Sequence, residues 1–276
     1  MGKYSDILIT SDFDRTLTGT DGKIPQANLD AIEEFMAQGG AFTVNTGRSL
    51  TLARLFLDRV PVNAPVLLYN GAAAYDKATG EFSQLKPIPM EQGKLLRELM
   101  ALYPDVIVEV QAHTGHYTFS TQPEWAAIYE SMGADYGYKT PDSDMGPFLK
   151  ASLLGPFTDL TIGGLFEGNQ KLIERYDAIE ADLNAHFGGK LSILRATPVI
   201  IDLQAAGVDK GVAARELAER MGRKTLVCIG DERNDLAMLN AADLPFCPAD
   251  GAVASLYPNA APCNQGTVAD VIRNRL

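Results

Sequence analysis

Four separated segments of this 276-residue chain carry the acids, the lysine and the hydroxyl that phosphate chemistry needs. They are Asp12-Phe13-Asp14-Arg15-Thr16, Thr46-Gly47-Arg48, Lys210, and Gly230-Asp231-Glu232-Arg233-Asn234-Asp235. The first follows an apolar run at 7–10 and the last follows one at 226–229, so each lies where a buried strand passes into a loop. Ligands bind at the carboxyl ends of strands in open parallel sheets. We therefore expect one site assembled from several strand ends.

The acids predict a cation in this site. Asp12 and Asp14 are two residues apart, so both carboxylates project to the same side if the backbone stays extended. Neighbouring acids repel each other unless a cation lies close by or one acid keeps a proton. Asp231 and Asp235 add negative charge from another strand end. A hard divalent cation with oxygen ligands, most plausibly Mg²⁺, would relieve the repulsion.

These residue types suit phosphoryl transfer. With Mg²⁺ bound, one carboxylate of the first pair can attack phosphorus directly. Thr46 and Lys210 supply a hydroxyl and an ammonium for the oxygens of the transferring group. The second acid can protonate the leaving alkoxide and then deprotonate the water that cleaves the acyl phosphate. The sequence therefore predicts hydrolysis of a phosphate monoester through an aspartyl phosphate.

Strand and helix signals alternate at both ends of the chain, as is typical of a parallel sheet. The expected strands are 7–10, 41–44, 65–69, 226–229 and 244–247, and the expected helices contain 29–36, 52–56, 212–221, 235–240 and 268–272. Ser49 can cap the second of these helices. We predict an α/β fold with a Rossmann-like parallel sheet core and helices on both faces.

A different pattern fills the middle of the chain and predicts an inserted α+β domain. Its signals are a helix at 95–100, a hairpin of 106–110 with 116–119, a strand at 160–162, a helix at 172–183, and strands at 191–194 and 199–203. The predicted domains are 1–84 and 204–276 for the discontinuous core and 85–203 for the insert.

The ordered set of residues resembles the haloacid dehalogenase superfamily of Mg²⁺-dependent phosphatases over nearly the whole chain. The family's first motif matches Asp12, Asp14 and Thr16, and its second matches Thr46. Its third motif matches Lys210, and its fourth matches Gly230, Asp231, Asn234 and Asp235. The insert is similar to the C2-type cap of the Cof-like, sugar-phosphatase branch. That branch is also indicated by Thr46-Gly47-Arg48, Asn70-Gly71-Ala72 and Asp209-Lys210-Gly211.

The resemblance implies roles for these residues. Asp12 would be the nucleophile and Asp14 the acid and base, with Thr46 and Lys210 completing the catalytic set. Asp12, the Asp14 backbone carbonyl and Asp231 would hold the metal, supported by Asn234 and Asp235. Substrate-binding residues would be Thr46, Gly47, Arg48, Lys210 and Asn234. The implied substrate is a sugar phosphate. Arg15 departs from the pattern, because many relatives have glycine there; it can face solvent, pair with Asp21 or Glu232, or bind substrate.

Two other functions remain open at this point. A sugar phosphomutase would use the same scaffold but return the phosphoryl group to the sugar. A phospho-accepting module resembling a response-regulator receiver also combines clustered aspartates with a threonine and a lysine. Such a module would need neither the insert nor Asp14 as a leaving-group acid.

Composition limits the partners. With 24 basic and 35 acidic residues, the formal net charge is −11, which disfavours nucleic acid and anionic membranes as partners. The expected partner is a small phosphorylated metabolite. Three cysteines without a CxxC spacing favour a reducing compartment. No apolar run approaches the roughly 18 residues of a membrane span, and the first residues lack a signal-peptide core. We expect a cytoplasmic protein; the oligomeric state does not follow from the sequence.

Other residues have a structural and a functional interpretation. His113 and His116 flank the hairpin turn, where they would be solvated or face the substrate. His186 is expected to interact with the end of its helix. Trp125 and Tyr129 are four residues apart in a predicted helix, which favours packing on one face.

Overall fold

The structure of the protein is a computed structural model that describes residues 2–119, 129–131, 133–155 and 169–276. Its chain forms two compact units. The first comprises Met1–Gly47, Phe56–Gln84 and Asp209–Leu276, and the second comprises Arg48–Leu55 and Leu85–Val208. Residues 48–55 thus interrupt the first unit. The domain boundaries drawn from the sequence stay a prediction.

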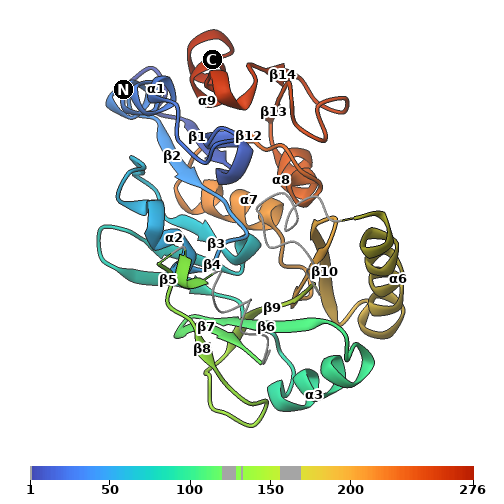
Figure 1. Cartoon of the computed structure of the whole chain (residues 1–276). Coiled ribbons are helices and arrows are strands. Elements are labelled where there is room, and N and C mark those ends of the chain that lie inside the picture. The colour runs from blue at the N-terminus through green and yellow to red at the C-terminus, as the bar shows by residue number, and fades with distance from the viewer. Residues whose placement is uncertain (1, 120–128, 132, 156–168) are drawn as a thin grey trace. The chain divides into compact units, whose positions relative to one another are not determined.

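The first unit is built on a five-stranded, fully parallel sheet in the order β14-β13-β12-β1-β2 (Figure 1). The strands are β1 (Ile7–Ser11), β2 (Ala41–Val44), β12 (Thr225–Ile229), β13 (Leu244–Pro248) and β14 (Asn259–Ala260). Ser11 at the end of β1 lies opposite Ile229 of β12 and Val44 of β2. β12, β1 and β2 therefore end together, and the loops that follow them start at one edge.

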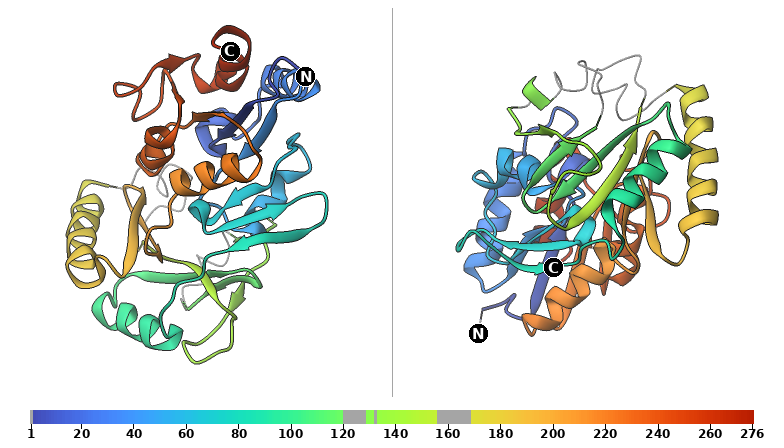
Figure 2. Two further views of the ribbon diagram at one scale, coloured as in Figure 1. Left: turned by 180° about the vertical axis from the view of Figure 1, so that it is seen from behind. Right: turned by 90° about the horizontal axis from the view of Figure 1, so that it is seen from below.

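Helices cover both faces of this sheet, as the sequence predicted. They are α1 (Gln26–Ala37), α7 (Lys210–Arg220), α8 (Leu236–Ala241) and α9 (Thr267–Asn274). α1 packs against α9 on one face, and α7 packs against α8 on the other (Figures 1 and 2). Leu217 of α7 and Met238 of α8 share a buried cluster with Leu8 and Leu226 of the strands. Apolar residues from both layers thus fix the helices to the strands that carry the site.

β3 (Val66–Leu68) differs from the expected third parallel strand. A single parallel bridge, Asn45 with Leu67, joins it to the chain after β2. Its ladder is antiparallel and pairs it with β4 (Ala73–Asp76), which continues to β5 (Glu81–Leu85). The physical reason is the short turn Tyr69–Gly71, in which three successive residues have φ of 52°, 52° and 92° and reverse the chain.

The second unit contains a six-stranded sheet in the order β10-β11-β9-β6-β7-β8. Its strands are β6 (Ile107–Ala112), β7 (Gly115–Thr118), β8 (Gly137–Tyr138), β9 (Phe148–Leu154), β10 (Leu191–Thr197) and β11 (Ile200–Ala205). α3 (Gln92–Leu102) and α6 (Gln170–Phe187) pack on one face, where Leu96 and Tyr176 meet Val110, Leu153 and Leu203. α2 (Leu50–Leu57) begins in this unit and ends in the first.

The predicted hairpin and helices of the insert are confirmed, and β6 pairs antiparallel with β7. β9 was not predicted from the sequence, although it is the strand between β6 and β11. The predicted strand at 160–162 lies outside the described residues, as does Trp125. Within the described ranges, no helix is both long and apolar enough to cross a membrane.

Candidate active site

Lys210 joins two of the predicted aspartates directly. Its Nζ lies 2.7 Å from Oδ1 of Asp12 and 2.6 Å from Oδ1 of Asp235, and the lysine side chain is 1% exposed. Lys210 is the first residue of α7, which begins where the Asp209 side chain accepts hydrogen bonds from the amides of Gly211 and Val212. The helix cap therefore fixes the backbone from which the ammonium extends.

Asp12 and Asp231 follow strands that are adjacent in the sheet. The amide of Asp12 donates to the carbonyl of Ile229 at 2.8 Å, which extends the β1–β12 ladder by one residue. Thr16 Oγ1, from the same loop as Asp12, donates to Oδ1 of Asp231 at 2.8 Å. The first and fourth motifs are thus connected by a buried hydrogen bond.

Asp235 shapes the loop after β12. Its Oδ2 accepts hydrogen bonds from the amides of Asp231 and Glu232, at 3.0 and 3.1 Å. Because its Oδ1 pairs with Lys210, both carboxylate oxygens are in use. A side chain at Gly230 would meet Asp235 at 2.6 to 2.8 Å, so only glycine leaves room for this arrangement.

The acids of this cluster are harder to ionise than free aspartate. Burial raises the pKa of Asp12 to about 7; Lys210 opposes this rise, while Asp235 and Asp14 add to it. Burial also raises the pKa of Asp231 to about 8, with further repulsion from Asp12 and Asp235. Burial alone would lower the pKa of Lys210, but Asp12 and Asp235 outweigh it and raise that pKa. One ammonium faces several acids, so part of the negative charge stays uncompensated.

Oxygens of Asp12, Asp231 and Asp235 lie within 4.8 Å of one another, which suits a metal ion. Oδ1 of Asp12 pairs with Lys210 and Oδ1 of Asp231 accepts from Thr16, which leaves Oδ2 of each acid for a ligand. Hard divalent cations take such oxygens, and a cation would relieve the repulsion that raises both pKa values. The donor set therefore fits the expected cation.

Asp14 has an extended backbone (φ −75°, ψ 128°), as does Asp12 before it. It lies inside the helical turn Phe13–Leu17, however, so the run from Asp12 to Asp14 is not the extended stretch that the sequence prediction assumed. Phe13 between them stacks on Phe56 with ring centroids 3.6 Å apart. The half-buried Asp14 is close enough to raise the pKa of Asp12. Its carboxylate does not belong to the three-acid cluster.

Arg15 is exposed and has a left-handed backbone with φ of 56°. In the described chain its guanidinium pairs with neither Asp21, which binds Lys23, nor Glu232, which caps the following turn. Arg15 thus faces solvent in this structure, and a role in substrate binding stays a prediction. Glycine adopts this positive φ without the steric penalty that an arginine has there.

Glycines allow close packing around the start of α7, which carries the third motif. A Cβ at Gly71 would lie 2.5 Å from the carbonyl oxygen of Asp209. A Cβ at Gly211 would lie 2.2 Å from the carbonyl oxygen of Ala237, so this glycine lets α7 pack closely on α8. Buried Thr46 is held through its backbone, because its amide donates to Leu67 and its carbonyl accepts from Asn70.

The roles of two further predicted residues stay open to test. Asn234 is half-buried in the turn after β12, and its side chain makes no hydrogen bond with another described residue. Arg48 belongs to the second unit, whereas Thr46 and Gly47 belong to the first. The substrate-binding roles of both residues stay predictions. Thr16 and Asn45, whose contacts hold the site together, were not predicted as site residues.

His116 differs from a solvated turn histidine, because it is 1% exposed and part of a buried polar cluster. Its Nε2 lies 3.1 Å from Oε2 of Glu109 and 3.1 Å from the hydroxyl of Tyr129, which also donates to Glu109. Ser49 Oγ lies 3.5 Å from Nδ1. Burial raises the pKa of Glu109, but His116 and Tyr129 outweigh it and lower that pKa overall.

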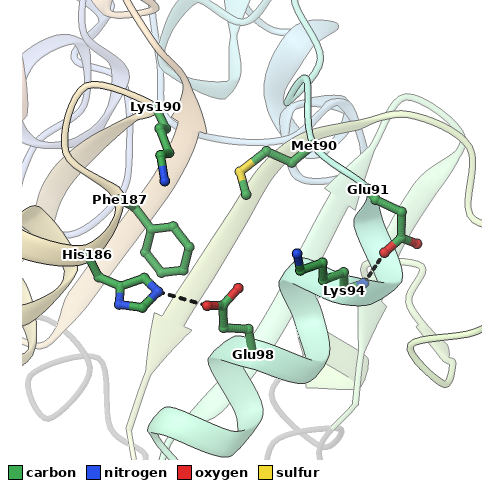
Figure 3. Close-up of a pocket in the computed structure, with 7 residues that line it drawn as sticks. All are labelled: Met90, Glu91, Lys94, Glu98, His186, Phe187 and Lys190. Atoms are coloured by element: carbon green, nitrogen blue, oxygen red, sulfur yellow. Dashed lines mark hydrogen bonds and ion pairs between the residues drawn. The ribbon is translucent and has the colours of Figure 1, made fainter.

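A pocket of about 320 Å³ lies in the second unit between α3 and the end of α6 (Figure 3). It is lined by Met90, Glu91, Lys94, Glu98, His186, Phe187 and Lys190. His186 lies in the last turn of α6, and its Nε2 lies 2.8 Å from Oε1 of Glu98 in α3, so the histidine also pairs with a side chain of another helix. None of the predicted site residues lines this pocket.

Comparison with known proteins identifies the family. Residues 9–254 match the haloacid dehalogenase-like hydrolase family. A Streptococcus pyogenes protein named as a candidate phosphatase is 25% identical over 251 residues, covering 88% of this chain and 87% of the relative. A Bacillus subtilis protein named 5-amino-6-(5-phospho-D-ribitylamino)uracil phosphatase is 20% identical over 244 residues, covering 86% and 81%.

Solved structures share the fold. A haloacid dehalogenase-like hydrolase from Bacteroides thetaiotaomicron superimposes with a TM-score of 0.78 at 20% identity, covering 99% of this chain and 100% of that one. One from B. subtilis gives 0.80 at 17% identity, covering 98% and 99%. A subclass IIB sugar phosphatase of the superfamily gives 0.76 at 17% identity, covering 97% and 98%. With the match over residues 9–254, the chain belongs to the haloacid dehalogenase-like hydrolases and is an enzyme.

Proposed function

We propose that this protein is a Mg²⁺-dependent phosphatase that hydrolyses a small phosphate monoester. The observation that carries the proposal is the buried contact of Lys210 with both Asp12 and Asp235, beside Asp231 at the end of the neighbouring strand. Such a site combines a carboxylate nucleophile with a fixed positive charge for phosphoryl oxygens. The phosphatase names of the curated relatives support the same reaction.

Asp12 and Asp231 would hold the metal, with the Asp14 backbone carbonyl and Asn234 beside them. When bound, Mg²⁺ would neutralise charge on the acids and on the transferring phosphoryl group. Asp235 would support this site from outside, because its oxygens already bind Lys210 and two backbone amides. Its role is to hold the loop of Asp231 in shape.

Each step of the reaction is then carried out by a different residue of the chain. Oδ2 of Asp12 forms a bond to phosphorus while the bond from phosphorus to the leaving oxygen breaks, and Asp14 gives that oxygen its proton. Asp14 next removes a proton from water, which attacks the acyl phosphate and releases inorganic phosphate. Lys210 keeps Oδ1 of Asp12 fixed, so the other oxygen faces the substrate. Thr46 and Lys210 stabilise the phosphoryl oxygens as charge develops.

We propose a sugar phosphate as the substrate class. The C2-like insert, drawn at 85–203 from the sequence, would select the leaving group, with Gly47 and Arg48 adding contacts to the phosphate or its neighbours. The subclass IIB sugar phosphatase among the structures of the same fold is consistent with this class. A small anionic substrate is compatible with the net charge of −11, because Lys210 and a cation provide local positive charge.

The test is a panel of phosphate monoesters assayed for free phosphate with Mg²⁺ present, alongside isomer analysis of each sugar phosphate. We expect phosphate release that disappears in Asp12→Asn and on complete metal removal. Asp58→Asn, an exposed aspartate of the same unit, is the matched control and should retain activity. Isomerised sugar phosphate without free phosphate would favour a mutase, and a persistent aspartyl phosphate without turnover would favour a phospho-accepting module. Release by Asp12→Asn would refute the mechanism.

A further inference from the structure

Asn45, the residue after β2, makes contact with all three chain segments that carry Asp12, Thr46 and Lys210. It precedes Thr46, and its amide donates to the carbonyl of Ser11, the residue before Asp12, at 2.8 Å. Its side-chain Nδ2 donates to the carbonyl oxygen of Lys210 at 2.9 Å. Asn45 is 0% exposed. The partner of the side chain is a carbonyl, so the contact requires the amide NH₂ group as donor.

The hydrogen bonds of Asn45 are incomplete. Its Oδ1 is buried and accepts no hydrogen bond from any described residue. A buried polar atom without a partner costs stability, and such atoms are few in native proteins. An apolar residue at this position would avoid that cost, so packing alone does not explain an asparagine here. What the amide provides is its donor to Lys210.

The hydrogen bond from Asn45 can affect the site because it holds the backbone of Lys210. Asp209 caps the first turn of α7, and Gly71 packs closely against the Asp209 carbonyl, so this turn is fixed from two sides. Asn45 adds a third contact, from the strand end that carries Thr46. The Lys210 ammonium extends from this backbone to Asp12 and Asp235 at 2.7 and 2.6 Å, distances that a small displacement would lengthen.

We propose that Asn45 is a positioning residue that holds Lys210 against Asp12. Its catalytic consequence rests on the proposed phosphatase function, whereas its effect on Lys210 does not. Loss of the Nδ2 donor lets the first turn of α7 move, so the ammonium loses its alignment with the nucleophile. Misalignment of a charged group lowers the rate of the chemical step more than it weakens substrate binding.

The experiment compares Asn45→Ala and Asn45→Ser with Asn63→Ala. Asn63 makes the same kind of contact in the same unit, because its Nδ2 donates to the carbonyl of Gly40 at 2.9 Å before the start of β2. The first readout needs no activity: each protein is treated with acetic anhydride, and Lys210 acetylation is followed by mass spectrometry. We expect Lys210 to be protected in the wild type and in Asn63→Ala, and to react at least about threefold faster in the Asn45 variants. Asn45→Ser provides the result if Asn45→Ala does not fold.

The second readout is a kinetic double-mutant cycle with Lys210→Met, using p-nitrophenyl phosphate and Mg²⁺. We expect Asn45→Ala to lower kcat about tenfold with KM changed less than about threefold, and to have little further effect in the Lys210→Met background. Equal Lys210 reactivity in the Asn45 and Asn63 variants, or effects on kcat that simply add, would overturn the proposal. If no variant or wild-type protein has phosphatase activity, the proposed function fails while the acetylation result still decides the role of Asn45.

Discussion

Replacing Asp231 by asparagine should stabilise the metal-free protein at alkaline pH. The carboxylate of Asp231 is buried beside Asp12 and Asp235, and its pKa rises from 3.8 to about 8. The folded protein therefore keeps a proton that the unfolded chain has already lost, so stability falls as pH rises from about 4 to about 8. An uncharged amide of the same shape removes this cost and can still accept the hydrogen bond from Thr16.

The size of the effect follows from the shift. About four pKa units at about 1.4 kcal/mol each give a ceiling of about 6 kcal/mol above pH 8. Local relaxation and counter-ions relieve part of this repulsion, so we expect a gain of at least about 2 kcal/mol. For a chain of this size that corresponds to roughly 4 °C in melting temperature. At pH 4 the gain should vanish, because both folded and unfolded Asp231 then hold much of their proton.

The assay is calorimetric melting of protein stripped of metal with a chelator, at pH 8.5 and pH 4. Asp58→Asn removes an exposed acid from the same unit and should show no pH-dependent gain. Adding Mg²⁺ at pH 8.5 should stabilise the wild type by mass action and stabilise Asp231→Asn much less. A variant that melts below the wild type by the same amount at both pH values would refute the account of a strained acidic cluster.

Three further results are expected. Arg15→Gly should leave the free energy of unfolding in urea unchanged or raise it by up to about 1 kcal/mol, because glycine adopts the positive φ without strain but loses more chain entropy on folding. A clear loss of stability would show that the Arg15 side chain contributes contacts. Gly211→Ala should destabilise the first unit by about 2 kcal/mol or more, because the added methyl would overlap the Ala237 carbonyl and separate α7 from α8; wild-type stability in the same urea series would contradict the close packing. In the second unit, the lowered pKa of Glu109 contributes stability that is present above about pH 4.5 and is lost as the pH falls below it. Hydrogen exchange in β6 and β7 should detect this loss in the wild type, and Glu109→Gln should not show it.

The sequence predicts that Asp12 and Asp231 lie close together, because the geometry of a parallel sheet brings the ends of adjacent strands to one edge. Asp12 and Asp231 both follow apolar strands, and parallel neighbours end at the same edge of a sheet. The position of Lys210 at a helix start was also readable, since Asp209 before it is a strong N-cap residue. Family motifs then supplied the order of these segments along the chain, and the family is confirmed.

Other features depend on contacts that no spacing rule encodes. Asn45 looks like any polar residue at a strand end until the Lys210 carbonyl is found beside it. His116 is buried because Glu109 and Tyr129 complete its hydrogen bonds, which residues in the turn itself do not indicate. The reversal after β3 was within reach, because Asn70-Gly71 is a turn dipeptide and turns of this kind join antiparallel strands.

The chain passes from the first unit to the second directly after Gly47 and returns directly before Asp209. Gly47, Arg48 and Lys210 are therefore the phosphate-binding candidates nearest to two of the four covalent connections between the units. A rotation of one unit about the other would change backbone torsions at these two junctions and at the two others, 55–56 and 84–85. Substrate binding and motion between the units would thus depend on some of the same peptide bonds. A change in backbone stiffness at these junctions would alter turnover without replacing a catalytic side chain.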